Sequence, residues 1–165
     1  MSINLSYVQI LKSPLMMELK QMIEHSGISC SGIIVELTES GYLEGTPAVR
    51  SVWNDMKQLR IQIALDDFGT GYSNLMNISN LEPDIVKLDR GFTLKALSRS
   101  YEYQLMQYVI EMVHKLNQYV CVEGVETKED LEKIKALGPD LIQGYYYSKP
   151  CSRDEFLKKF FGYSE

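Results

Sequence analysis

The sequence of 165 residues is poor in soft metal ligands, with three cysteines and two histidines. Cys30, Cys121 and Cys151 are odd in number and lack the close spacing of zinc ligands, so we expect buried free thiols in a reducing cytoplasm. No apolar stretch approaches the roughly 20 residues that cross a bilayer, and the first residues do not resemble a signal peptide. We therefore expect a cytoplasmic protein without a disulfide framework, a zinc centre or a membrane segment.

A basic surplus is also absent, because the formal net charge is −5. A general DNA-binding protein needs a basic face that neutralises phosphates, so DNA is not an expected partner. An acidic protein can still bind a phosphate ester when metal ions supply the positive charge. Its 45% hydrophobic and 24% charged residues are ordinary for a globular protein, and the length allows one compact domain with a core.

Six strand-like segments each end in a polar residue that suits metal or phosphate chemistry. They span Ile3–Ser6, Ile33–Glu39, Ile63–Gly71, Asp84–Asp89, Val120–Glu126 and Leu141–Tyr147. Their candidate working groups are Asn4, Glu36, Asp66 with the adjacent Asp67, Lys87, Glu123 and Gln143. In a parallel α/β barrel, the carboxyl ends of different strands meet at one mouth. The pattern therefore predicts one site that holds divalent cations and an anionic substrate.

Helix signals lie between these strands. Capping residues or a proline at the first position precede helical apolar spacing at Ser13–Pro14, Thr46–Pro47, Ser100, Thr127–Asp130 and Ser152–Glu155. We expect the Met, Trp and Phe residues of these helices to lie in the core. Strands that alternate with helices predict parallel βαβ units. Between Gly69 and Asn80, glycines and turn formers predict a mobile loop or a short helix.

The length limits the architecture. A complete (β/α)8 barrel of the TIM type usually needs about 250 residues, and this chain supplies about six βα units. Two α/β architectures remain open: a truncated TIM-type barrel and a smaller open sheet. Met1 is followed at once by a strand, which suggests a fragment of a longer parent. Because an unpaired inner strand is an association site, we expect another copy to cover the exposed edge, in a homodimer or a higher oligomer.

Six ordered blocks of sequence resemble one family. The blocks are INLSYVQI, VELTES, ALDDFGTGYSNL, IVKLDRGF, VEGVET and QGYYYSKP, and they run from Asn4 to Pro150. They are similar to the EAL family of bacterial phosphodiesterases, which hydrolyse cyclic di-GMP to linear pGpG. The Glu-Ala-Leu tripeptide of that family does not occur here. The resemblance therefore implies a partial EAL domain over residues 1–165, without the first two strands, the metal-binding glutamate and a substrate-binding arginine.

The resemblance also implies roles for single residues. Asn4, Glu36 and Asp66 would hold a first Mg²⁺ or Mn²⁺ together with the missing glutamate. Asp66 would bridge to a second ion that Asp67 also binds. Both aspartates can reach metals only if the strand ends there, because adjacent residues of a regular strand point to opposite sides.

Four further residues acquire roles from the same resemblance. Glu123 would act as general base or orient the attacking water, and Lys87 would hydrogen-bond that water or stabilise phosphate charge. Gln143 would position water or phosphate. Glu39 would anchor the loop Gly69–Leu75, which contributes to dimerisation in the family. Glu126 would support the metal ligands without binding the metal itself.

Each assignment has a simpler structural alternative. Taken alone, the adjacent aspartates indicate a solvated acidic turn, and Lys87 indicates a surface charge. Gln143 could be a buried structural amide, and Glu126 an ordinary acid at a helix start. The run Tyr145–Tyr147 offers a stacking surface for guanine or packs in the barrel.

Two functions follow from the resemblance. The first is a metal-dependent cyclic di-GMP phosphodiesterase of bacterial signalling, with a sensory or cyclase domain upstream in the parent. The loss of one ligand and two strands leaves open whether this polypeptide is active by itself. The alternative is a non-catalytic module that binds cyclic di-GMP or a partner protein.

Overall fold

The computed structural model describes residues 1–12, 14–38, 47–70, 78 and 82–162. Within them, six strands form one sheet in the order of the chain, and every neighbouring pair is parallel. The strands are β1 (Ser2–Asn4), β2 (Ile34–Thr38), β3 (Gln62–Phe68), β4 (Ile85–Leu88), β5 (Tyr119–Glu123) and β6 (Leu141–Gln143).

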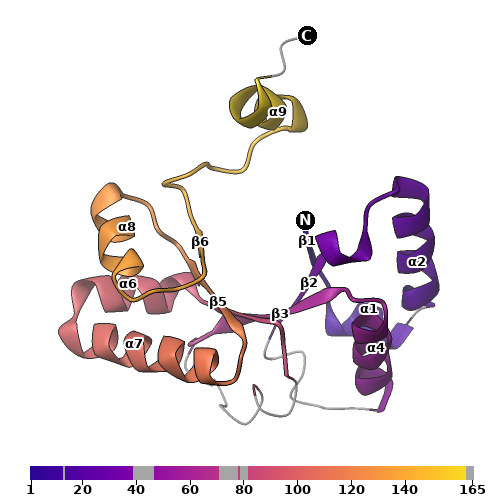
Figure 1. Cartoon of the computed structure of the whole chain (residues 1–165), viewed down its shortest axis with the longest axis horizontal. Helices are drawn as coiled ribbons and strands as arrows, with labels where there is room; N and C mark the ends of the chain where they lie inside the picture. The colour runs from indigo at the N-terminus through magenta and orange to yellow at the C-terminus, as the bar shows by residue number, and fades with distance from the viewer. Residues whose placement is uncertain (13, 39–46, 71–77, 79–81, 163–165) are drawn as a thin grey trace.

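Helices occupy the connections between these strands. They are α1 (Tyr7–Lys12), α2 (Leu15–Ser26), the 3-10 turn η1 (Cys30–Gly32), α4 (Pro47–Gln58), α6 (Arg90–Ser98), α7 (Ser100–Lys115), α8 (Lys128–Lys135) and α9 (Arg153–Phe161). Figure 1 shows α1, α2 and α4 beside the first strands and α6, α7 and α8 beside the later ones. The curled parallel sheet with helices on its outside is the expected truncated TIM-type barrel, a half-barrel of six strands.

The pairing register decides which side chains share a face. Asn4 pairs with Glu36, and Glu36 with Ala64. Lys87 pairs with Cys121, and Glu123 with Gln143. Because side chains alternate along a strand, all six polar strand ends lie on the concave, inner face of the half-barrel.

The other face carries the main core. Its strand residues pack against the apolar stripes of the helices; they include Val35, Leu37, Ile63, Leu65, Val86, Leu88, Val120 and Val122. Trp53 of α4, Met56 of α4 and Met106 of α7 are buried there, as expected. A smaller apolar group of Ala64, Ile85 and Cys121 lies on the inner face. Burial therefore concentrates where helices cover the sheet.

Two aspartates fasten neighbouring strands at the amino ends. Asp84, before β4, accepts hydrogen bonds from the backbone N–H of Ile63 and from Lys57, both at 2.8 Å. Asp140, before β6, accepts hydrogen bonds from the backbone N–H of Val120 at 2.7 Å and pairs with His114 at 2.9 Å. The same device therefore joins β3 to β4 and β5 to β6, each time with a partner from a helix.

Several predicted helix starts are confirmed. Thr127 and Ser152 each form a complete capping box, with Asp130 and Glu155 respectively. Pro47 is the first residue of α4, while Thr46 lies outside the described residues. The start of α2 is shifted by one residue, because Pro14 is its N-cap and Leu15 its first residue. Ser13 is not among the described residues.

Other expectations are wrong in detail. The last strand ends at Gln143 and not at Tyr147, because the chain turns at Gly144 and Tyr146 N–H donates to the Val125 carbonyl at 3.0 Å. The aromatic residues of α9 are not core, since α9 buries no side chain and projects away from the sheet beyond β6 (Figure 1). Helices α1 and α6 were not predicted. None of the described helices has both the length and the apolar character needed to cross a membrane.

Candidate active site

Lys87 lies at the centre of the polar strand ends. Its Nζ is 2.7 Å from Glu36 Oε2, 3.0 Å from Asp66 Oδ1 and 2.7 Å from Glu123 Oε1. These side chains come from β4, β2, β3 and β5, so four neighbouring strands contribute one charged group each. Lys87 is only 5% exposed, which contradicts the interpretation of a surface charge.

The charges in this cluster do not balance, because three carboxylates surround one ammonium group. Burial by itself would lower the pKa of Lys87, but hydrogen bonds to Glu123, Glu36 and Asp66 outweigh it and raise that pKa above its usual value. Burial raises the pKa of Glu123; Lys87 opposes this shift, and the charges of Asp66 and Glu36 add to it. Lys87 is therefore a permanent cation, and Glu123 holds a proton more readily than an exposed carboxyl.

The paired aspartates reach the cluster by a route that the sequence did not predict. The strand continues to Phe68 and does not end at Asp66. Leu65 pairs with Val86 and Phe68 with Leu88, so two residues of β3 lie opposite the single Lys87. This is a bulge, and Asp67 in it has a φ of 60°. Regular alternation is thus broken at the aspartates, and Asp67 N–H donates to Asp66 Oδ1 at 3.0 Å.

The environment of Asp67 is itself acidic. Partial burial raises its pKa first, and the charges of Asp66 and Asp89 raise it further against the opposing charge of Lys87. An acidic pair that repels itself in this way favours a bound cation. The exposed Asp67, in the bulge, still fits the solvated turn that an isolated pair suggests, whereas Asp66 does not, because it is half-buried within β3 and its Oδ1 lies 3.0 Å from Lys87 Nζ.

Asn4 and Gln143 lie on the outermost strands, β1 and β6, and both are exposed. Gln143 is therefore not a buried structural amide. Glu126 does not join the carboxylate cluster; it accepts hydrogen bonds from Arg90 at 2.7 and 3.2 Å on the surface. Glu39 and the loop residues 71–75 lie outside the described residues.

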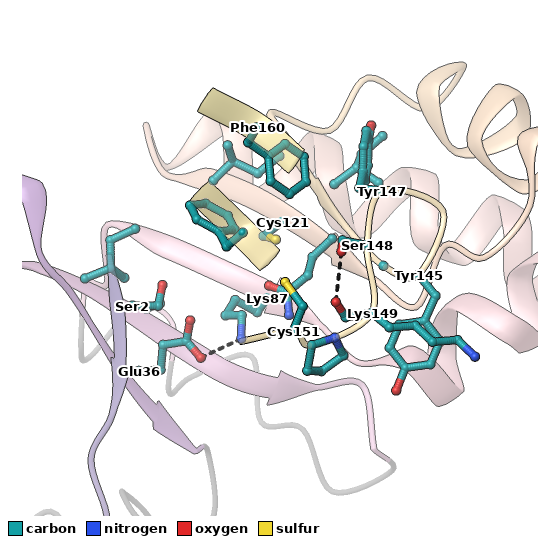
Figure 2. A pocket seen from close by; sticks show the side chains of 18 of the residues that line it. Ser2, Glu36, Lys87, Cys121, Tyr145, Tyr147, Ser148, Lys149, Cys151 and Phe160 are labelled. Carbon is teal, nitrogen blue, oxygen red and sulfur yellow. Dashed lines mark hydrogen bonds and ion pairs between the residues drawn. The ribbon is translucent and has the colours of Figure 1, made fainter. Parts of the chain in front are cut away.

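A cavity of about 770 Å³ opens beside the cluster, on the inner face of the half-barrel. Figure 2 shows Glu36 and Lys87 at this cavity, together with Cys121 and residues that follow β6. Ile34, Ala64 and Ile85 give it an apolar wall, and Phe156 and Phe160 of α9 complete it. The cavity thus joins the charged cluster to apolar surface.

Cys121 was not singled out from the sequence, apart from its thiol being expected to be buried and free. That expectation is confirmed for Cys121, while Cys30 is half-buried and Cys151 is exposed. Burial raises the pKa of the Cys121 thiol to about 12. The alternation of β5 could have placed Cys121 on the same face as Glu123.

Tyr145–Tyr147 follow β6 in a turn and are exposed, so they do not pack inside the barrel. Tyr145 and Tyr147 line the cavity, and Lys149 Nζ lies 5.6 Å from the centre of the Tyr145 ring. Their aromatic faces are therefore accessible.

The donor set fits hard divalent cations. Asn4, Glu36, Asp66 and Asp67 offer amide and carboxylate oxygens, which Mg²⁺ and Mn²⁺ prefer. In the part of the chain that the structure describes, no three His, Cys, Asp or Glu side chains are grouped to hold a metal ion. Lys87 stands between three of the carboxylates, so metal binding requires these side chains to rearrange around it.

Comparison with known proteins agrees with this geometry. The EAL domain profile matches residues 1–150. The chain is 32% identical over 149 residues to the cyclic di-GMP phosphodiesterase PdeF of Escherichia coli strain K12, covering 90% of this chain and 20% of PdeF. The chain therefore belongs to the EAL domain family, and it spans about a fifth of the length of this curated relative.

Solved structures show the same fold. The EAL enzyme Bd1971, with cAMP and cyclic di-GMP bound, superposes with a TM-score of 0.90 at 32% identity, over 96% of this chain and 42% of Bd1971. Klebsiella pneumoniae BlrP1, in complexes of cyclic di-GMP with manganese or calcium, gives a TM-score of 0.85 at 26% identity, over 91% of this chain and 38% of BlrP1.

Proposed function

We propose that this chain forms most of the active site of a metal-dependent phosphodiesterase that hydrolyses cyclic di-GMP to linear pGpG. One observation carries the proposal: the polar ends of six parallel strands lie on one face, with Lys87 buried among Glu36, Asp66 and Glu123. Active sites of parallel barrels lie at the carboxyl ends of the strands. The names of PdeF and Bd1971 support this substrate class.

Asn4, Glu36 and Asp66 would hold a first Mg²⁺ or Mn²⁺, and Asp66 with Asp67 a second. When bound, such ions acidify a water molecule and neutralise phosphoryl oxygens. The oxygen donors of the site and the manganese complex of BlrP1 support this assignment. A further carboxylate from outside this sequence would complete the first site, since the sequence has no Glu-Ala-Leu tripeptide.

The remaining side chains handle protons and charge. Glu123 accepts a proton from the attacking water, and its raised pKa brings it closer to the working pH that favours a general base. Lys87, always protonated, donates hydrogen bonds to phosphate oxygen or to the water and cannot act as a base. Gln143, at the exposed edge, orients water or phosphate through its amide. Glu39 would anchor the loop Gly69–Leu75, and Glu126 would act at the rim of the site through its pairing with Arg90.

The parent protein is proposed to be longer and to contain a sensory or cyclase domain. The greater length of PdeF and Bd1971 supports this. The assignment of residues 1–165 as a partial EAL domain, and its cytoplasmic location, are parts of the same proposal.

A second copy is proposed to cover the open half-barrel. Phe156, Phe160 and Phe161 of α9 are exposed, and among the described residues no strand pairs with the outer edges of β1 and β6; both features support association. Light scattering of the purified chain should give the mass of a dimer or a higher oligomer. A monodisperse monomer at micromolar concentration would contradict this part.

The activity is tested by incubating the purified chain with cyclic di-GMP and Mg²⁺ or Mn²⁺, and by following pGpG by chromatography. Product formation would mean that the further carboxylate is dispensable, and Glu36→Gln should then abolish turnover. Glu132→Gln is the matched control, because Glu132 is exposed on α8 and its ion pair with Lys128 is long, at 3.9 Å. Binding without product would leave catalysis to the longer parent or favour the non-catalytic module, and neither binding nor product from a folded sample would overturn the proposal.

A further inference from the structure

Two of the three cysteines enter the same cavity. Cys121 lies on the inner face of β5, in register with Lys87 on one side and Leu141 on the other. Cys151 lies on the segment between β6 and α9, and both side chains line the cavity of about 770 Å³ (Figure 2). They are separated by 30 positions in the sequence, and the fold alone brings them to one site.

The segment that carries Cys151 is anchored at one end only. The turn after β6 is fixed, because a Cβ on Gly144 would collide with the backbone of Val125, and Tyr146 N–H donates to the Val125 carbonyl at 3.0 Å. Lys159 also holds the Tyr147 carbonyl, at 3.0 Å. Among the described residues, the backbone of positions 148–151 has no hydrogen bond to the sheet. This segment can therefore shift toward the inner face without breaking strand pairing.

Helix α9 is tied to the turn after β6 by Lys159 but packs loosely against the sheet. None of its side chains is buried, and Phe156 and Phe160 are 46% and 48% exposed although they line the cavity. Movement of the segment toward β5 would bring these rings closer to the apolar wall formed by Ile34, Ala64 and Ile85. Burial of further apolar area would favour that closed arrangement.

We propose that Cys121 and Cys151 form a reversible disulfide that fastens the segment between β6 and α9 over the inner face of the half-barrel. The bond requires the two Cα atoms to lie within about 7 Å of each other, and the segment between β6 and α9 is the part that would move to reach this separation. A cross-link of this kind in a reducing compartment is regulatory and not structural.

The oxidant is a peroxide. The exposed Cys151 reacts first: its thiolate attacks one peroxide oxygen, the O–O bond breaks, and a sulfenic acid and hydroxide result. The hydroxide released in this step takes up the Cys121 proton, the Cys121 thiolate attacks the Cys151 sulfur, the S–O bond breaks, and the departing hydroxide is protonated to water. In total, two thiols lose two electrons and two protons, and hydrogen peroxide becomes two molecules of water. A dithiol reductant restores both thiols by exchange.

The third cysteine provides a matched control within the chain. Cys30 lies in η1 and is half-buried, and it is not among the residues that line the cavity. Cys30→Ser should therefore leave the cross-link unchanged. Cys151→Ser should abolish it, and this substitution is at an exposed position outside helices and strands, so it should leave the fold intact.

The test is peptide mapping by mass spectrometry, without reduction, after the reduced chain has been treated with equimolar hydrogen peroxide. We expect a linked Cys121–Cys151 peptide in the wild type and in Cys30→Ser, and its loss in Cys151→Ser and Cys121→Ser. Links that involve Cys30, bonds between two Cys151 residues of different copies, or an over-oxidised Cys151 beside a free Cys121 would each overturn the proposal.

A functional consequence rests on the proposed phosphodiesterase activity. The disulfide would hold Pro150 and Cys151 over the cavity beside Lys87 and Glu36, so oxidation should lower cyclic di-GMP hydrolysis at least tenfold. Dithiothreitol should restore it, and Cys151→Ser should be insensitive to peroxide. Mass spectrometry detects the cross-link whether or not the chain hydrolyses cyclic di-GMP. If the chain shows no hydrolysis, the disulfide can therefore still be tested.

Discussion

The two faces of the sheet differ in what they bury. The outer face packs apolar side chains such as Leu65 and Val86 against helices, and both residues are fully buried. The inner face places charged groups at the carboxyl ends of the strands and leaves a cavity beside them. The outer face therefore supplies most of the apolar burial that stabilises the fold, while the inner face holds the charged groups of the proposed site.

The largest effect is expected where charge is buried. Lys87→Met removes the cation that Glu36, Asp66 and Glu123 share and leaves one buried and two half-buried carboxylates without it. We expect a loss of about 3–5 kcal/mol in the free energy of unfolding, measured by urea denaturation. Lys128→Met is the control, since Lys128 is exposed and forms only a long ion pair. Equal stability of Lys87→Met and the wild type would show that the network does not stabilise the native state.

A pair of apolar truncations compares the two faces directly. Leu65→Ala on the outer face should cost about 2–5 kcal/mol, because it leaves a cavity in a close-packed core. Ile34→Ala on the inner face should cost about 1 kcal/mol, because Ile34 is only partly buried beside the open cavity. Chemical denaturation of both variants provides the measurement. A cost for Ile34→Ala as large as that for Leu65→Ala would contradict this difference between the two faces.

The smallest effect concerns the aspartate that links β5 to β6. Asp140→Asn weakens the hydrogen bond to Val120 N–H and the pairing with His114, and it should cost about 1 kcal/mol at neutral pH. Partial burial would raise the pKa of Asp140, but Val120 N–H and His114 outweigh burial and lower it.

The contribution of Asp140 should depend on pH in one direction. Its folded-state pKa is lowered, so its stabilisation is present above the unfolded value of about 3.9 and is lost as the pH falls through the folded value. The stability difference between the wild type and Asp140→Asn should therefore vanish on acidification below about pH 4. A difference that grows on acidification would contradict this role.

Much of the fold could be predicted from local patterns. The order of strands and helices follows from apolar periodicity, and the capping boxes at Thr127 and Ser152 are local interactions. The end of β6 could not be predicted in this way, because Gly144 is fixed by close contact with Val125, which lies elsewhere in the sequence. The exposure of α9 is likewise decided by packing and not by its own amphipathic pattern.

The site was predictable in its members more than in its geometry. Because side chains alternate between the two faces of a strand, the sequence places Glu36, Lys87 and Glu123 on one face. The bulge at Asp66 and Asp67 depends on pairing between β3 and β4, so the sequence of β3 alone predicted a strand end. The ion network around Lys87 also depends on the register of four strands. Metal binding and the catalytic roles of these residues stay predictions.

The most direct test of the account is a titration of the purified chain with Mn²⁺ in the presence of cyclic di-GMP, with free Mn²⁺ read by electron paramagnetic resonance. The account predicts saturable uptake by the wild type and at least tenfold weaker uptake by Asp66→Asn, with Glu132→Gln unchanged. Equal uptake by the wild type and Asp66→Asn, or no uptake by the folded wild type, would contradict a metal site at the strand ends.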